Sequence, residues 1–175
     1  ITTTTSPVTD EYAGGGALAI NNERYHFDNG LTGSDTVNHN IEFTNNLVSG
    51  YNLGIALYGQ YELSDYRGVK YHHNVFVDCE YAIGDYVNNA KVRPGGIEII
   101  NNIFAGPMVG HVDGGDTSNV LNDYNCWYSA PDKHIGQNDI IANVTLARTS
   151  GWRDQPDETV IKSADFVPID GSANY

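Results

Sequence analysis

Three segments of alternating apolar and polar residues recur at an even spacing in the middle of the chain. They are Ile41–Val48 (IEFTNNLV), Val69–Phe76 (VKYHHNVF) and Ile97–Phe104 (IEIINNIF), and their starting points lie 28 residues apart (69 − 41 and 97 − 69). Alternation at every second position is the period of a half-buried β-strand, not of an α-helix. Self-similarity at a fixed period of this length predicts a stacked repeat, a solenoid.

Two weaker copies flank these segments. Ala17–Asn22 (ALAINN) precedes the first by 24 residues (41 − 17), and Val120–Trp127 (VLNDYNCW) follows the last by 23 (120 − 97). Five copies predict five stacked coils. Each copy carries an asparagine at the end of its strand; these are Asn22, Asn46, Asn74, Asn102 and Asn125. Asparagine tolerates the left-handed conformation of a sharp turn, and stacked amides can hydrogen-bond from one coil to the next.

Large apolar residues follow the asparagines two positions later and predict a column of core side chains, formed by Val48, Phe76, Phe104 and Trp127. Further apolar stretches, Leu53–Tyr58, Tyr81–Tyr86 and Met108–Val112, predict a second strand in each coil. The predicted organisation is a linker or truncated edge over residues 1–16, coils over 17–135 and a cap over 136–175. In the cap, Asn143–Thr149 can form a short helix, and Trp152, Ile161, Phe166 and Val167 can cover the last coil.

At elements such as Asn101–Phe104 (NNIF) the chain resembles the right-handed parallel β-helix proteins of the pectate-lyase-like superfamily. The resemblance covers about residues 17–127. A looser similarity to the closing segment of secreted polysaccharide-degrading enzymes extends over Asp123–Tyr128, 146–152 and 163–168. It implies an all-β, right-handed parallel β-helix of about five coils, and a protein that binds and cleaves a polysaccharide as a hydrolase or lyase.

Composition limits the partners. Nine Lys and Arg against 22 Asp and Glu give a net charge of −13, which opposes binding to nucleic acid or to an anionic membrane surface. No apolar run approaches the roughly 20 residues of a membrane span. The polar, acidic and Tyr-rich composition favours a secreted or extracellular protein. Cys79 and Cys126 lie two coils apart, about 9.6 Å of rise, so we predict no disulfide between them.

One candidate centre lies on an outward face. The 28-residue offset stacks Glu42, Lys70 and Glu98. The resemblance implies Lys70 as the base that removes a proton beside a uronate carboxylate, and Arg93 could bind that carboxylate through its planar fork. The alternative interpretation is a ladder of opposite charges on a solvated face.

A second candidate centre uses carboxylates. The same offset stacks Asp85 under Asp113, with Asp116 nearby. Two carboxylates one coil apart would suit a retaining glycosidase, or Asp113 and Asp116 could bind Ca²⁺; no cofactor is otherwise required. Strict alternation, however, places Asp85 on the same face as Ile83, and the Asp-Gly-Gly-Asp sequence is also typical of a turn.

Candidate sugar contacts lie on the second strands. Tyr58 and Tyr86 stack by the same offset and could form an aromatic platform. The Gly110-His111 pair is similar to one element of the polygalacturonases, which makes His111 a third candidate, although the Asp-Asp and Arg-x-Lys elements found there are absent. The rival function is a non-catalytic structural or adhesive module, either a fragment of a longer β-helix or a subunit that stacks end to end through its open N-terminal coil.

Overall fold

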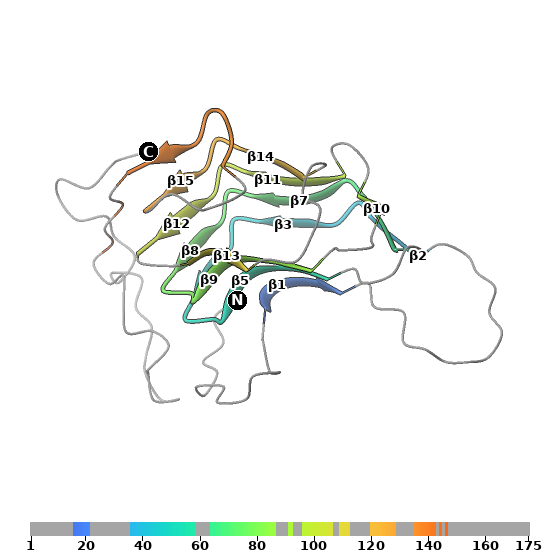
Figure 1. Ribbon diagram of the computed structural model, residues 1–175, viewed down its shortest axis with the longest axis horizontal. Coiled ribbons are helices and arrows are strands. Elements are labelled where there is room, and N and C mark those ends of the chain that lie inside the picture. Colours follow the sequence, from blue (N-terminus) through green and yellow to red (C-terminus); the bar gives the residue numbers. More distant parts are fainter. Residues whose placement is uncertain are drawn as a thin grey trace.

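The structure is a computed structural model that describes residues 16–21, 36–58, 64–86, 91–92, 96–106, 109–112, 120–128 and 135–142, together with Val144 and Leu146. This part of the chain consists of parallel β-strands arranged in four sheets, which confirms the all-β class (Figure 1). No helix in these ranges is long and apolar enough to cross a membrane.

Each sheet takes its strands from successive repeats of the chain. Sheet I contains β3 (Glu42–Thr44), β7 (Val69–His72), β11 (Ile97–Ile100) and β14 (Val120–Asp123). Sheet II contains β4 (Leu47–Ser49), β8 (Val75–Val77), β12 (Ile103–Ala105), β15 (Cys126–Trp127) and β16 (Ile140–Ile141). Sheet III contains β1 (Gly16–Asn21), β5 (Leu53–Tyr58), β9 (Tyr81–Tyr86) and β13 (Val109–Val112). Sheet IV contains β2 (Thr36–His39), β6 (Ser64–Arg67) and β10 (Lys91–Val92).

The strand register confirms the 28-residue repeat in the centre of the chain. In sheet I, Lys70 is aligned with Glu42 on one side and with Glu98 on the other. In Figure 1 the strands β3, β7, β11 and β14 lie one above another, and β8, β12 and β15 form the neighbouring row. The shorter spacing before β14 is also confirmed, because Ile97 is aligned with Val120.

The first weak copy belongs to a different sheet from the one predicted. Residues 17–21 lie in β1, which pairs with β5 of sheet III and not with β3, and Leu18 is aligned with Ile55. The sequence Ala-Leu-Ala-Ile alternates as β5 does, so periodicity could not decide between the two sheets. Sheet I therefore has four described strands, where five copies were expected. Asn22 lies outside the described residues.

The predicted asparagine ladder is present from Asn46 to Asn125. The Oδ1 atom of Asn74 accepts hydrogen bonds from the backbone N–H and the Nδ2 of Asn46, at 2.9 and 3.0 Å. Asn102 does the same for Asn74, and Asn125 for Asn102. The Nδ2 atoms of Asn74, Asn102 and Asn125 also donate backwards to a carbonyl of the preceding repeat, as from Asn74 to Phe43 at 2.9 Å, whereas Asn46 donates to Thr44 of its own repeat. The ladder amides thus keep their hydrogen-bonding capacity satisfied while buried.

The sequence predicted that the ladder asparagine adopts the left-handed conformation of each turn. In the structure, the residue before it does so instead. Asn45, His73, Asn101 and Tyr124 all have φ close to 57°. This backbone conformation turns the chain between sheets I and II and leaves the next residue, the asparagine, free to point into the ladder. His73 and Tyr124 show that the position does not require asparagine or glycine, although a non-glycine residue in this conformation is uncommon.

The predicted core column is confirmed. The rings of Phe76 and Phe104 are stacked with centroids 4.9 Å apart, and Trp127 stacks on Phe104 at 4.0 Å. Val48, aligned with Phe76, is also buried. On the facing side of the core, β5 and β9 contribute Ile55, Leu57 and Ile83, all fully buried.

Tyr71 brings a polar group into this core. Its ring stacks on Phe43 with centroids 5.0 Å apart, and its hydroxyl is buried without a hydrogen-bond partner. Burial raises the pKa of Tyr71 well above its usual value, and the neighbouring Tyr66 adds to the effect. A buried hydroxyl without a partner opposes folding, because it has lost its hydrogen bonds to water.

We therefore expect Tyr71→Phe to stabilise the protein by about 1 kcal/mol, since the ring is kept and only the hydroxyl is removed. Urea unfolding of the two proteins, compared at equal m-values, measures the difference. A clear loss of stability in Tyr71→Phe would show that the hydroxyl is hydrogen-bonded in solution.

An aspartate ends the asparagine ladder. Asp139 Oδ1 accepts a hydrogen bond from the backbone N–H of Asn125 at 2.7 Å, in the place where another asparagine would stand. Its Oδ2 accepts from Trp127 Nε1 and from the Gly136 N–H, each at 2.8 Å. The last ladder position needs only acceptors, which a carboxylate supplies. The sequence reasoning missed this residue, because the spacing from Asn125 to Asp139 is 14 residues, half the main repeat.

The region after Gly136 loses the 28-residue spacing, as predicted, but parallel pairing continues because β16 pairs with β15. Val144 and Leu146 are buried against Val77, Ala105 and Cys126. The predicted helix over 143–149 is not present at its two described positions, because Val144 belongs to no regular element and Leu146 forms a β-bridge. The other residues of that segment, and the predicted cover residues Trp152, Ile161, Phe166 and Val167, lie outside the described residues. Cys79 and Cys126 are both buried and are not joined by a disulfide, which confirms that prediction.

Gly136 is held against the backbone of β14. A Cβ atom at this position would overlap the carbonyl oxygen of Asn122 and lie 2.6 Å from Asp123 Cα. We expect Gly136→Ala to lower the free energy of unfolding by about 1–3 kcal/mol, because backbone atoms cannot give way as a side chain can. Thermal or urea unfolding measures this, with Gln137→Ala at the exposed neighbouring position as the control. Equal stability of the two variants would contradict the close approach.

Candidate functional site

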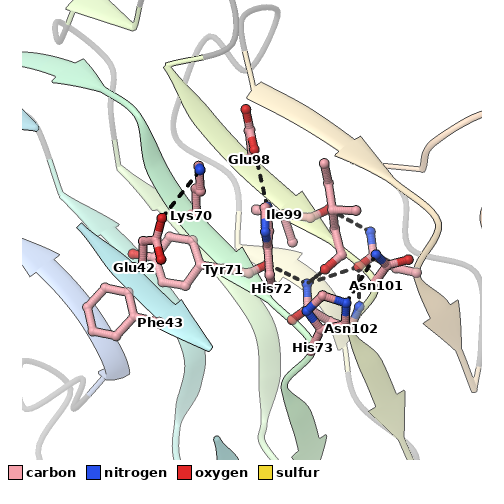
Figure 2. Close-up of polar contacts among 12 residues, drawn as sticks. Glu42, Phe43, Lys70, Tyr71, His72, His73, Glu98, Ile99, Asn101 and Asn102 are labelled. Atoms are coloured by element: carbon pink, nitrogen blue, oxygen red, sulfur yellow. Dashed lines mark hydrogen bonds and ion pairs between the residues drawn. The ribbon is translucent and has the colours of Figure 1, made fainter. Parts of the chain in front are cut away.

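The outward face of sheet I carries the charged residues predicted from the repeat. On β7, Val69 and Tyr71 are buried while Lys70 and His72 are half-buried, and β11 shows the same alternation. Lys70 Nζ lies 3.3 Å from Glu42 Oε1, and the two side chains are 37% and 57% exposed (Figure 2). Glu98 approaches His72 instead, with 3.2 Å between Oε2 and Nε2.

The contact between His72 and Glu98 is a close approach and not a hydrogen bond, because the His72 Nε2 atom is buried without a partner in suitable geometry. It becomes an ion pair only when the imidazole is protonated. The face therefore carries one ion pair between repeats, as the charge-ladder interpretation expects, while Glu98 turns towards histidine. Arg93, the proposed partner of Lys70 in elimination, lies outside the described residues, so that centre stays a prediction.

Of the candidate carboxylate centre, the structure describes only the backbone of Asp85. Asp85 lies in β9, aligned with Leu57, which is fully buried. This backbone alignment is the one that the 28-residue offset predicts. Asp113 and Asp116 lie outside the described residues, so neither the paired carboxylates nor the calcium site is tested. Among the residues that are described, no three His, Cys, Asp or Glu side chains gather as a metal site would require.

The predicted sugar contacts lie in sheet III. Tyr58 and Tyr86 are aligned in the pairing of β5 with β9, as the 28-residue offset predicted. His111 is aligned with Ile83, which in turn is aligned with Ile55, and both isoleucines are fully buried. The backbone register thus places the two tyrosines on neighbouring strands at the same position. It places His111 at the position that buried isoleucines occupy in β9 and β5.

An open hollow lies at the corner between sheets I and II, beside residues that the sequence reasoning did not assign to a site. Its volume is about 420 Å³. It is lined by three left-handed turn residues, two ladder asparagines and two half-buried apolar residues of sheet II: His73, Asn101, Tyr124, Asn74, Asn102, Val75 and Ile103. The available sequence signal was the residue before each ladder asparagine, a position to which the sequence patterns had assigned no role.

The polar groups of this corner hollow lie close together. Asn101 Nδ2 is 3.4 Å from His73 Nε2, one repeat away (Figure 2). With Nδ2 donating, Nε2 is the unprotonated nitrogen of a neutral imidazole. Tyr124, in the next repeat, is 55% exposed. The hollow therefore combines an exposed aromatic ring, an amide and an imidazole above an apolar floor.

The carboxylate of Asp123, the residue before Tyr124, is hydrogen-bonded to the loop that follows β15. Asp123 accepts hydrogen bonds from the N–H of Asn138 at 2.7 Å, from Asn138 Nδ2 at 2.8 Å and from the Tyr124 N–H at 3.0 Å. These bonds, chiefly the one from the Asn138 side chain, lower the pKa of Asp123 below its usual value. The hydrogen bonds of the folded state therefore stabilise the ionised form of Asp123.

A lowered folded-state pKa stabilises the protein above the unfolded-state pKa of about 4, and this stabilisation is lost as the pH falls through the folded value. We expect Asp123→Asn to be less stable than the natural chain at pH 6, and the difference to shrink progressively below about pH 4. Urea unfolding at a series of pH values measures it. A difference that stays constant from pH 6 to pH 3 would show that the Asp123 carboxylate is not responsible.

Comparison of the chain with known protein families, with characterised proteins and with solved structures found no match.

Proposed function

We propose that the chain is a right-handed parallel β-helix of the pectate-lyase-like kind, and that it is a secreted protein that binds a polysaccharide along its stacked repeats. Four rows of parallel strands at a main spacing of 28 residues, joined at one corner by an asparagine ladder, support the fold. The resemblance of the repeat element to that superfamily supports the function. Fold alone does not establish an activity, so the function depends on the site.

The observation that carries the proposed function is the alignment of Tyr58 with Tyr86 in sheet III. Neighbouring strands lie about 4.8 Å apart, so residues aligned in this way follow one another along the stack. Two tyrosines in such a row suit the apolar face of a sugar chain, and their hydroxyls suit its polar edge. We call this row, defined by Tyr58 and Tyr86, the tyrosine row.

Binding is tested by titrating the protein with neutral and uronate oligosaccharides of six units in a calorimeter. We expect binding to at least one of them and about tenfold weaker binding in Tyr86→Ala, because an aromatic contact has been removed. Tyr128→Ala, which changes an exposed tyrosine directly after β15 of sheet II, is the control. Unchanged binding in both Tyr58→Ala and Tyr86→Ala would remove the tyrosine row from the proposed function.

Cleavage is the second part of the proposal, and its two chemistries use different residues. Hydrolysis needs an acid and a second carboxylate, for which Asp85 and Asp113 are the candidates. Elimination needs a base and a cation facing the uronate, for which Lys70 and Arg93 are the candidates. Reducing ends together with ultraviolet absorbance from unsaturated products would identify a lyase, and reducing ends alone a hydrolase. Activity that persists in all four variants, Asp85→Asn, Asp113→Asn, Lys70→Ala and Arg93→Ala, would exclude both centres.

A structural module that associates through strand edges is the alternative function. Ile140 and Ile141 favour it, because they are 50% and 52% exposed on β16, an edge strand in the part of the chain that the structure describes. Exposed apolar edge strands invite pairing with another chain. Sedimentation velocity tests this: concentration-dependent growth that is lost in Ile140→Lys supports association, and a monomer at all concentrations excludes it.

A further inference from the structure

We propose that the corner hollow between sheets I and II is a separate binding site for an uncharged sugar ring, such as one pyranose unit of a neutral glycan. It lies on different strands and turns from the tyrosine row of sheet III. The proposal therefore does not depend on binding or cleavage at that row, and it uses residues that play no part in the candidate catalytic centres.

The hollow presents the two surfaces that a pyranose requires. One face of the sugar ring is made of C–H groups and packs on apolar or aromatic surface. Val75 and Ile103, aligned in neighbouring strands of sheet II, supply an apolar floor. Tyr124 supplies an aromatic ring that is 55% exposed although it borders this floor. A large aromatic side chain left half in water beside an apolar hollow is suited to covering a ligand.

The edge of the sugar carries hydroxyl groups, each of which donates and accepts hydrogen bonds. Asn101 offers both an amide donor and a carbonyl acceptor, and His73 Nε2 offers an acceptor 3.4 Å from the amide nitrogen. Both residues are exposed. A pair of adjacent hydroxyls can therefore bind to Asn101 and His73 at the same time, in place of the long contact that these two side chains make with each other.

The backbone under the hollow is already fixed before any ligand binds. His73, Asn101 and Tyr124 share one left-handed conformation, with φ of 57°. The asparagine that follows each of them, Asn74, Asn102 and Asn125, is fully or almost fully buried in the ladder. Binding therefore costs little ordering of the main chain, and only the exposed side chains must settle.

Charge decides the class of sugar. Among the described residues that line the hollow there is no Asp, Glu, Lys or Arg. A uronate or sulfated sugar is typically bound by a cation, for which arginine is the best suited side chain. The net charge of −13 also repels a polyanion from the protein as a whole. These two facts favour a neutral glycan over a uronate at this site.

The test uses the intact chain labelled with ¹⁵N and titrated at pH 8, where imidazole groups are neutral. The probes are xylohexaose, cellohexaose and mannohexaose, with hexagalacturonate as the charged comparison. We expect at least one neutral probe to shift the amide signals of His73, Asn101 and Tyr124, and hexagalacturonate to shift them less at equal concentration.

Variants then assign the contacts. Tyr124→Ala is expected to weaken binding of the neutral probe at the hollow about tenfold. Tyr124→Phe should retain it within about twofold, because the ring remains. Tyr128→Ala, a partly exposed tyrosine that does not line the hollow, is the matched control and should bind normally.

A second pair of variants tests the amide. Asn101→Asp keeps a side chain that tolerates the left-handed turn but removes the Nδ2 donor and adds a charge, so about tenfold weaker binding is expected. Asn45→Asp makes the same change at the equivalent turn position outside the hollow and should leave binding unchanged. Unfolding curves of both variants establish that the fold is kept.

Three results would overturn the proposal: no neutral probe shifts these signals, Tyr124→Ala and Asn101→Asp bind as their controls do, or hexagalacturonate binds the hollow more tightly. The outcome is separable from that of the tyrosine row. Tyr58→Ala and Tyr86→Ala are expected to leave the shifts of His73, Asn101 and Tyr124 intact. Sugar binding that is lost in those variants alone would exclude the corner site and support the row.

Discussion

Replacing Phe104 by alanine is expected to lower the free energy of unfolding by about 3–5 kcal/mol, the largest loss that we expect from a single apolar truncation in this protein. Phe104 is 1% exposed and lies between two other rings, 4.9 Å from Phe76 and 4.0 Å from Trp127. Its removal leaves a cavity between two stacked aromatic rings. These rings are fixed by their own strands, so the site cannot collapse to fill the space.

Urea unfolding at a fixed pH measures this loss as a lower midpoint at an unchanged m-value. Leu121→Ala is the control, because Leu121 is 45% exposed on β14 and its truncation should change stability by no more than about 0.5 kcal/mol. If Phe104→Ala unfolds at the same urea concentration as Leu121→Ala, the aromatic column does not support the fold.

Replacing Asn102 by alanine is expected to cost about 2–6 kcal/mol, although only a small polar side chain is removed. Asn102 is 1% exposed, and its Oδ1 atom accepts hydrogen bonds from both the backbone N–H and the Nδ2 of Asn74. Without it, the Asn74 backbone N–H has no partner and the Asn74 Nδ2 keeps only its bond to the Phe43 carbonyl. Two buried N–H groups are then unpaired, at about 1–3 kcal/mol each. The carbonyl of Tyr71 also loses its bond from Asn102 Nδ2.

Asn101→Gly is the matched control, one residue earlier in the same turn. Asn101 is exposed and has φ of 57°, a conformation that glycine adopts without strain. Its stability should therefore stay within about 0.5 kcal/mol of the natural chain. Equal unfolding midpoints for Asn102→Ala and Asn101→Gly would mean that the ladder hydrogen bonds are replaced by bonds to water.

The closing aspartate suggests why the ladder has a direction. At each step from Asn46 to Asn125, the backbone N–H and one hydrogen of Nδ2 donate to the Oδ1 of the next ladder asparagine. The final position receives donors and needs none of its own, so the carboxylate of Asp139 suits it. The same carboxylate binds the indole of Trp127, and so couples the end of the ladder to the end of the aromatic column.

The parts of the fold that depend on the repeat period and on side-chain type could be predicted from the sequence. Equal spacing of Ile41, Val69 and Ile97 gave the strand register, because a parallel stack aligns residues one repeat apart. The ladder and the aromatic column followed from the same alignment, since identical residue types at one repeat position lie over one another. The absence of a disulfide between Cys79 and Cys126 followed from the rise between their repeats.

Features that depend on which surfaces pack together could not be predicted in this way and required the three-dimensional fold. The strand β1 joined sheet III because alternation is the same for either sheet, and the choice rests on packing of Leu18 in the shared core. The role of Asp139 could not be predicted, because it lies 14 residues after Asn125 and so does not fit the 28-residue repeat. The corner hollow was hidden because His73, Asn101 and Tyr124 share no residue type, and only their common backbone conformation brings them to one corner.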